Sequence, residues 1–200
     1  MSGVLIIPGL RNSGPQHWQT VWQKRLPNAE RIRMKQWDTP DLQQWVDATI
    51  AAVRKYRPSY LVAHSFGCLA TAHALDAIKD QIRGVLLVAP ADPDKFDIAE
   101  LLPHSPLPVP GLVVGSLTDP WLSWNKAQQW AQRWLLPIIC AGDAGHINAE
   151  SGHSDWQEGW ELLQRLQQRD VSRRELPRVD LARAELARSR PLSPRLAFSY

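Results

Sequence analysis

Short apolar runs recur along the first 140 residues of the chain, and each ends in a cluster of turn-forming residues. A continuous apolar run without polar alternation is typical of a strand that is buried on both faces of a sheet. We therefore expect buried strands at residues 3–7, 60–64, 83–89, 111–115 and 137–140, and a weaker strand at 31–34.

Between these runs, apolar residues recur at spacings of three and four, which indicates helices with one buried face. The expected helices begin near Pro15, at a cap formed by Thr39 or Asp41, directly after residue 65, at Ser123 and at Asp155. Strands that alternate with helices indicate a parallel sheet covered on both faces. The predicted fold class is therefore α/β, a three-layer α/β/α sandwich with a mostly parallel sheet.

Ten tryptophans are many for a chain of 200 residues. Residues i and i+4 lie on one face of a helix, so tryptophan pairs at this spacing predict stripes that pack against the sheet. The pairs are Trp18 and Trp22, Trp130 and Trp134, and Trp156 and Trp160.

Residues 96–110 contain four prolines among several apolar residues. Proline removes a backbone donor and breaks helices, so no long helix is expected there. The position of this segment after a predicted strand end leaves two interpretations open, a small flap over the functional site and a plain surface connection.

The length suits one domain, and the net charge of +3 comes from the C-terminal end of the chain. Residues 170–200 hold seven arginines and four acidic residues, whereas the first 169 residues are neutral. We expect one folded domain over residues 1–169 and an Arg-rich tail over residues 170–200 that is partly disordered. The tail alternates charge signs and lacks lysine, which argues against nucleic acid as a partner.

Several function classes lack their sequence signals. The N-terminus has no basic region followed by a long apolar stretch, and no run reaches the roughly 18 apolar residues of a membrane span. Cys68 and Cys140 do not suggest a disulfide framework and are interpreted as small buried residues. His146 and His153 share a loop, but a metal site needs more ligands than we find there. We therefore expect a cytoplasmic protein without a membrane segment, metal or cofactor.

The rest of the chain is organised around residues 60–70, Tyr-Leu-Val-Ala-His-Ser-Phe-Gly-Cys-Leu-Ala. They predict a strand, a tight turn and a helix, with a serine at the turn. The nucleophile elbow G-x-S-x-G has this architecture, in which a strained turn holds the serine oxygen at the end of the sheet. Ala63 replaces the first glycine and Gly67 supplies the second, so Ser65 is the candidate nucleophile. A buried serine in an ordinary strand-to-helix turn is the alternative.

Two further loops supply the partners of a catalytic triad. Asp119 follows the predicted strand at 111–115, and His146 follows the strand at 137–140. The order Ser65, Asp119, His146 is that of an α/β-hydrolase triad, and each residue follows a strand, where open α/β sheets place their sites. In such a triad His146 accepts the serine proton and Asp119 holds the imidazole.

A tetrahedral intermediate on the nucleophile also needs backbone donors. We predict the amide of Leu10, in the loop after the first strand, and the amide of Phe66, directly after the nucleophile. His17, Trp121 and Trp124 lie close to these loops in the sequence and are predicted to line the substrate pocket.

Three residues compete for these roles. Asp92 follows an earlier predicted strand and is the main alternative to Asp119. Asp143 is expected to support the loop in which it lies. His64 precedes the nucleophile within the strand, so alternation should point its side chain away from the serine, and we interpret it as structural.

Four segments together resemble the small serine hydrolases related to retinoblastoma-binding protein 9. They are residues 8–9 with 13–18, the elbow at 63–67, residues 116–121 and residues 142–148. The resemblance covers residues 3–168 and implies a compact α/β-hydrolase fold without a large cap domain. The family's motifs carry the nucleophile onto Ser65, the acid onto Asp119 and the base onto His146.

The sequence thus predicts a serine hydrolase that cleaves small esters or amides through an acyl-enzyme on Ser65, without metal or cofactor. The alternative from another class is a non-catalytic binding protein on a hydrolase scaffold, and the intact triad favours the enzyme. Because the family's substrates are poorly defined, the resemblance leaves the substrate open. The oligomeric state is open as well.

Overall fold

Six parallel strands form one sheet in the computed structural model, which describes residues 3–175, with side chains up to residue 168. Their order in the sheet is β2-β1-β3-β4-β5-β6. The strands are β1 (Val4–Ile7), β2 (Ala29–Arg31), β3 (Tyr60–His64), β4 (Gly84–Val88), β5 (Gly111–Gly115) and β6 (Ile138–Cys140).

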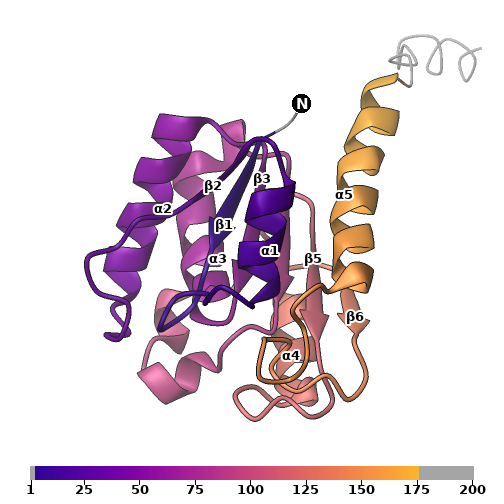
Figure 1. Ribbon diagram of the computed structural model, residues 1–200. Coiled ribbons are helices and arrows are strands. Elements are labelled where there is room, and N and C mark those ends of the chain that lie inside the picture. The colour runs from indigo at the N-terminus through magenta and orange to yellow at the C-terminus, as the bar shows by residue number, and fades with distance from the viewer. Residues whose placement is uncertain (1–2, 176–200) are drawn as a thin grey trace, which may run out of the picture. The chain divides into compact units, whose positions relative to one another are not determined.

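Helices connect the strands and cover both faces of the sheet. The α-helices are α1 (Trp18–Arg25), α2 (Leu42–Tyr56), α3 (Phe66–Ile78), α4 (Trp124–Arg133) and α5 (Gln157–Glu175), with short 3₁₀ helices η1 (Lys79–Gln81), η2 (Pro93–Phe96) and η3 (Ala99–Leu101). One layer is formed by α2, α3 and α4, and the other by α1 and the first part of α5 (Figure 1). The α/β class and the three layers predicted from the sequence are confirmed.

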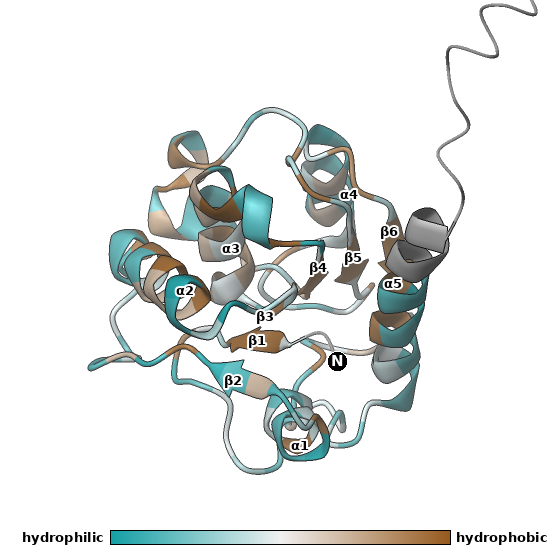
Figure 2. Cartoon of the chain, turned by 90° about the horizontal axis from the view of Figure 1, so that it is seen from above, coloured by the Kyte–Doolittle hydropathy of each residue, from teal (hydrophilic) through white to brown (hydrophobic). Residues whose placement is uncertain are grey.

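Successive residues of a strand face opposite helical layers, which explains why the strands are apolar throughout. In β1, Leu5 and Ile7 pack with the layer of α2, α3 and α4, whereas Val4 and Ile6 pack with α1 and α5. All four side chains are at most 2% exposed. Figure 2 shows the inner strands as hydrophobic between helices with hydrophilic outer surfaces. A parallel sheet covered on both faces requires this composition.

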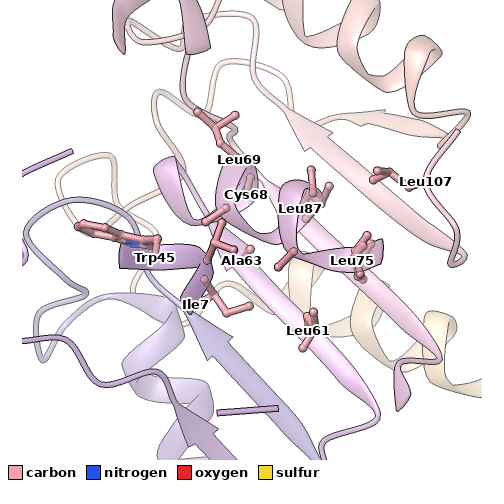
Figure 3. Close-up of a cluster of buried hydrophobic side chains, with 14 of the residues drawn as sticks. Ile7, Trp45, Leu61, Ala63, Cys68, Leu69, Leu75, Leu87 and Leu107 are labelled. Atoms are coloured by element: carbon pink, nitrogen blue, oxygen red, sulfur yellow. The ribbon is translucent and has the colours of Figure 1, made fainter. Parts of the chain in front are cut away.

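One core lies between the sheet and the layer of α2, α3 and α4 (Figure 3). The residues labelled there are Ile7, Trp45, Leu61, Ala63, Cys68, Leu69, Leu75, Leu87 and Leu107. Leu107 belongs to the proline-rich segment, which also buries Ile98, Leu102 and Val109 against this core. Most of the segment 96–110 is therefore a surface connection that covers the core, whereas its first residue, Phe96, lines the cavity at the carboxyl edge of the sheet.

A tryptophan cluster fills the core on the opposite face. The rings of Trp18 and Trp22 of α1 lie 4.5 Å apart. They meet Trp156, just before α5, and Trp160 within α5 at centroid distances of 5.4 to 6.0 Å. The indole nitrogen of Trp18 donates to the carbonyl oxygen of Ile147 at 2.8 Å, which ties the cluster to the loop after β6. The predicted core-facing stripes are confirmed, because all six paired tryptophans are buried.

Three elements begin elsewhere than predicted. α5 begins at Gln157, one residue later than a cap at Asp155 would give. β2 starts two residues before the expected strand at 31–34. α1 starts at Trp18 rather than near Pro15, because the side chain of His17 caps it by accepting the amide N–H of Gln19 at 3.2 Å. Side-chain acceptors at this position satisfy the free amides of a first helical turn.

The two cysteines differ in exposure. Cys68 is buried in α3, as expected. The prediction for Cys140 is wrong, since this residue is exposed. It ends β6, which is an edge strand of the sheet and has a neighbour on one side only.

The last described helix passes the boundary predicted at residue 169. Residues 170–175 continue α5. The rest of the predicted tail, residues 176–200, lies outside the described residues, so its partial disorder stays a prediction. Among residues 3–175, no helix combines the length and the apolar character needed to cross a membrane.

The indole of Trp18 provides a test with an internal control. Trp18→Phe leaves the Ile147 carbonyl without its donor, whereas Trp22→Phe removes an indole N–H that has no partner among the described residues. Both substitutions remove similar apolar area, so we expect Trp18→Phe to lower the free energy of unfolding by about 1–2 kcal/mol more than Trp22→Phe. Urea denaturation measures the difference, and equal losses would mean that the hydrogen bond does not stabilise the fold.

Candidate active site

Ser65 lies at the turn between β3 and α3 in a backbone conformation that residues with side chains rarely adopt. Its φ is 55° and its ψ is −125°. Such a conformation costs on the order of 1–3 kcal/mol and persists only where the surroundings enforce it. The amide of Ser65 donates to the carbonyl oxygen of Val88 at 3.1 Å, and its carbonyl accepts from the amide of Cys68 at 2.9 Å. The turn has the strained form of a nucleophile elbow.

Backbone segments touch on both sides of the elbow, and glycine allows them to do so. A Cβ atom on Gly67 would lie 2.6 Å from the carbonyl oxygen of Pro8, and one on Gly9 would lie 2.7 Å from the Cβ of Ser65. Neither distance leaves room for a side chain. Ala63, which replaces the first glycine of the motif, is fully buried within the core. The loop after β1 is thereby held against the nucleophile.

Ser65, His146 and Asp119 form a continuous chain of hydrogen bonds. Nε2 of His146 lies 2.9 Å from Oγ of Ser65, and Nδ1 lies 2.9 Å from both carboxylate oxygens of Asp119. Because a carboxylate can only accept, Nδ1 carries the proton of the neutral ring. Nε2 is then free to accept the serine hydroxyl hydrogen, which is the arrangement that activates a serine. The Asp119 side chain is only 3% exposed.

The loop after β5 fixes the position of Asp119. Its Oδ1 accepts the amide N–H of Trp121 at 2.9 Å. Nζ of Lys95, which follows β4, donates to the carbonyl oxygen of Pro120 at 3.1 Å. The loop that carries the carboxylate is thus bonded both to itself and to the neighbouring loop of the same sheet edge.

The two alternative acids are occupied elsewhere. Asp92 accepts a hydrogen bond from Nζ of Lys126 at 2.7 Å and makes no contact with the imidazole of His146. Asp143 is exposed on the surface of its loop. The structure therefore brings Asp119, and neither alternative, to the histidine.

Two hydroxyl residues that sequence reasoning did not single out join the acid loop to the base loop. Oγ of Ser116 donates to the carbonyl oxygen of Gly142 at 3.0 Å and accepts the amide N–H of Ala144 at 3.0 Å. Oγ1 of Thr118 accepts the amide N–H of Gly145 at 3.1 Å. The signal in the sequence was the pair of hydroxyl residues just before Asp119. They hold the two loops together and so set the spacing of Asp119 and His146.

His64 does not point away from the site, contrary to expectation. Its Nε2 donates to the carbonyl oxygen of His146 at 2.9 Å, and the two rings lie 4.8 Å apart. Burial lowers the pKa of His64 well below 6.5, and the nearby His17 and His146 lower it further. The alternation of β3 itself holds, because His64 faces the layer of α1 like Tyr60 and Val62 and contacts the ring of Trp18. The expectation fails because the loop that carries His146 lies over this same face. The side chain of His64 thus holds the backbone of His146.

A cavity of about 380 Å³ opens beside the triad. It is lined by Leu10, Arg11, Asn12, Gly14, His17, His64, Ser65, Ala91, Phe96, Trp121, His146, Asn148, Ala149 and Glu150. Residues at or after the ends of five strands, β1, β3, β4, β5 and β6, thus line one cavity, as expected for a site at the carboxyl edge of a parallel sheet. Within the described part of the chain, no group of three or more His, Cys, Asp or Glu side chains is placed to hold a metal ion.

The two tryptophans predicted for the pocket lie in different places. Trp121 lines the cavity with its ring 6.2 Å from that of His146, and half of its surface is exposed. Trp124 does not line the cavity. It is the first residue of α4, and its ring packs over Gly115 of β5, where an added Cβ would lie 3.2 Å away. The prediction for Trp124 is therefore corrected.

The loop of the predicted donor Leu10 approaches the amide of the other predicted donor, Phe66, at Gly9. Phe66 is the first residue of α3, so its amide lies at the free end of the helix. A Cβ on Gly9 would lie 3.1 Å from that amide nitrogen, which places the Gly9–Leu10 backbone beside it. The ring of Phe66 points into the core, where it meets Trp45 and Phe96 at 5.1 Å each.

His17 lies in the cavity wall and is buried. Its ring meets the ring of His64 edge-on at 4.8 Å. Burial lowers the pKa of His17 to about 4, with smaller contributions from the positive charge of Arg31 and from His146. The imidazole of His17 is therefore neutral at pH 7.

The close approach at Gly67 can be tested against a glycine with open space around it. Gly67→Ala forces its Cβ into the backbone of Pro8, so we expect a loss of about 1–3 kcal/mol in the free energy of unfolding. Gly14→Ala is the control, because a Cβ at Gly14 would meet nothing within 4 Å. Urea denaturation of both variants is the measurement. If Gly67→Ala were as stable as Gly14→Ala, the two backbones would not be in contact.

Comparison with known proteins agrees with this geometry. The B. subtilis (strain 168) candidate hydrolase YdeN is 33% identical over 93 residues, which make up 43% of this chain and 49% of YdeN. The match thus spans about half the length of that curated relative. The solved structure of a candidate YdeN-like hydrolase from Pectobacterium atrosepticum is 40% identical, covers 83% of this chain and 92% of its own, and superimposes with a TM-score of 0.78.

The solved structure of the B. subtilis ydeN gene product covers 83% of this chain and 98% of its own, at 24% identity and a TM-score of 0.70, and shares the fold. The family described as serine hydrolase matches residues 4–165. These residues contain the whole sheet, the elbow and the three side chains linked by hydrogen bonds. The chain belongs to the serine hydrolase family.

Proposed function

We propose that this protein hydrolyses small carboxylic esters or amides through an acyl-enzyme on Ser65. One observation carries the proposal: Oγ of Ser65, the imidazole of His146 and the carboxylate of Asp119 are linked by hydrogen bonds of 2.9 Å beside an open cavity. An ordinary serine is a weak nucleophile and requires an adjacent base, which in turn requires a group that orients it. Ser65 is the candidate nucleophile, His146 the candidate base and Asp119 the candidate group that orients the base.

Acylation begins when Oγ of Ser65 attacks the carbonyl carbon of the substrate. The serine proton passes to Nε2 of His146, and the buried carboxylate of Asp119 stabilises the resulting imidazolium. Collapse of the tetrahedral intermediate breaks the bond to the leaving alcohol or amine. Nε2 returns its proton to that leaving group, and the acyl group remains on Ser65.

Deacylation repeats the same steps with water as the nucleophile. His146 accepts a proton from water, whose oxygen attacks the acyl carbon of the ester on Ser65. The serine oxygen then leaves and takes the proton back from His146. The free carboxylic acid departs, and the enzyme returns to its starting protonation state.

The negative oxygen of each intermediate needs donors that are already in position. We assign this role to the amides of Leu10 and Phe66, and the close approach of Gly9 to the elbow supports the assignment. Loss of one such donor typically costs a factor of about 10² to 10³ in turnover. Because Phe66 begins α3, the helix dipole adds to the stabilisation of a negative charge there.

The size of the cavity favours small substrates. Its volume of about 380 Å³ lies near the lower end of the range for ligand pockets. Leu10, Phe96 and Trp121 supply apolar surface, while Asn12 and Asn148 add polar groups. The substrate class proposed is therefore a small ester or amide whose acyl or leaving group is not purely apolar.

The proposal also includes a group within the family and a location in the cell. The motifs at the elbow, at 116–121 and at 142–148 resemble the group of retinoblastoma-binding protein 9, and we propose a place within that group. A cytoplasmic location likewise stays a prediction.

The alternative function is a binding protein whose triad is present but unused. It predicts a serine that does not react.

Labelling with a fluorophosphonate probe distinguishes enzyme from binding protein. We expect the wild type to be labelled, and Ser65→Ala and His146→Ala to be almost unlabelled, because loss of nucleophile or base costs about 10⁶ in turnover. Asp119→Asn should lower turnover by about 10⁴, since an amide does not hold the required tautomer of the imidazole.

The control variant is Ser105→Ala, which removes an exposed serine away from the cavity and should label like the wild type. Circular dichroism and a melting curve establish that each variant is folded. A folded wild type that the probe does not label would favour the binding protein.

A further inference from the structure

The protonation of His17 is fixed by its position at the start of α1. Nδ1 of His17 lies 3.2 Å from the amide nitrogen of Gln19, and a backbone N–H can only donate. Nδ1 is therefore the acceptor, and the single hydrogen of the neutral ring is on Nε2. A second proton, on Nδ1, would break the helix cap. The capping bond and the neutral ring thus require one another.

Within residues 3–168, no hydrogen bond joins Nε2 of His17 to another residue, and Nε2 is not among the fully buried atoms that lack a partner. His17 as a residue is 7% exposed and lines the cavity, so a donor at Nε2 is left to water or a ligand there. The ring of His17 lines the cavity beside Ser65, while its Nδ1 edge faces the helix. The unpaired donor is therefore available to a molecule bound in the cavity.

The distance from His17 to the reacting groups suits contact with a substrate. One ring, that of His64, separates His17 from His146, with centroid distances of 4.8 Å on each side. A donor at this distance lies beyond the proton relay but within the reach of a small substrate attached to Ser65. His64 does not compete for the role, because its own Nε2–H is donated to the carbonyl of His146.

Burial and a neighbouring positive charge keep the imidazole of His17 neutral, so that Nε2–H stays an uncharged donor. The guanidinium of Arg31 is held by Oδ1 of Asn12 at 2.9 Å, the carbonyl of Ser13 at 3.0 Å and Oγ1 of Thr20 at 2.7 Å. This fixed positive charge opposes a second one on His17. A neutral donor of fixed tautomer recognises an oxygen acceptor and does not select for charge.

We propose that Nε2–H of His17 donates a hydrogen bond to a substrate oxygen other than the reacting carbonyl oxygen. The site then prefers esters or amides that carry an acceptor, such as an ether, hydroxyl or second carbonyl oxygen, close to the scissile bond. This inference rests on the proposed function, since it assigns a specificity contact within the same cavity.

Two substitutions separate the donor from the cap. In His17→Asn, the short side chain retains an oxygen that caps α1, because asparagine is among the best residues at this position, but no donor extends to the place of Nε2. In His17→Gln, the longer amide extends an N–H₂ group toward the place of Nε2, and the cap is lost. If His17 has only a structural role, His17→Gln should lose more activity than His17→Asn. If Nε2–H binds the substrate, His17→Asn should lose more of the preference for the acceptor-bearing ester.

The substrates are p-nitrophenyl methoxyacetate and p-nitrophenyl butyrate, whose acyl chains have the same length and differ by an ether oxygen in place of a methylene. Each kcat/KM is divided by the rate of the same ester with hydroxide, which removes the intrinsic reactivity. The ratio of the two normalised values is independent of the fraction of enzyme that is folded. We expect the wild type to favour the methoxyacetate, and His17→Asn to lose roughly tenfold of that preference, as for one neutral hydrogen bond.

His17→Gln should retain most of the preference, even where its melting temperature is lower. An unchanged ratio in His17→Asn, an equal loss for both esters, or a greater loss of the ratio in His17→Gln would overturn the inference while the hydrolase remains. Absence of Ser65-dependent turnover of either ester in the wild type would overturn the proposed function and this inference with it. Fluorophosphonate labelling of the same samples distinguishes the two failures.

Discussion

Contact between two backbone segments sets the geometry on which the site depends. The parallel register of β1 and β3 pairs Ile7 with Ala63, so the chain leaves both strands at the same level. Pro8 and Gly9 then lie directly against the elbow, at distances that exclude a Cβ on Gly9 or Gly67. The same contact places the loop of Leu10 beside Ser65. Strain at Ser65 is tolerated because the strands on either side of it are fully buried.

Three imidazole rings extend from this contact into the cavity wall, and each has a different task. His146 joins Ser65 to Asp119, His64 holds the backbone of His146, and His17 caps α1. Burial keeps the two supporting rings neutral at pH 7. Neither of them therefore repels the positive charge that would form on His146 during catalysis. The tryptophan cluster supports the loop of His146, because the indole N–H of Trp18 donates to the carbonyl oxygen of Ile147.

Much of this architecture is visible in the sequence, because it follows from local rules. Continuous apolar runs marked the strands, and the residues after each run marked the sheet edge at which Ser65, Asp119 and His146 meet. The rest depended on geometry that no local pattern encodes. His64 reaches the site because the loop of His146 folds over the face of β3 that His64 occupies, and the orientation of Trp124 follows from where α4 begins. Exposure of Cys140 required the strand order, which places β6 at an edge.

The central claim is that Ser65 becomes acylated during turnover. The most direct measurement is intact-protein mass spectrometry after acid quenching of a reaction with p-nitrophenyl acetate, followed by peptide mapping. The geometry predicts a mass increase of one acetyl group, located on Ser65, that is absent in Ser65→Ala and strongly reduced in His146→Ala. Hydrolysis of the ester without an acetylated serine, or with the acetyl group on another residue that Ser65→Ala leaves unchanged, would contradict the account.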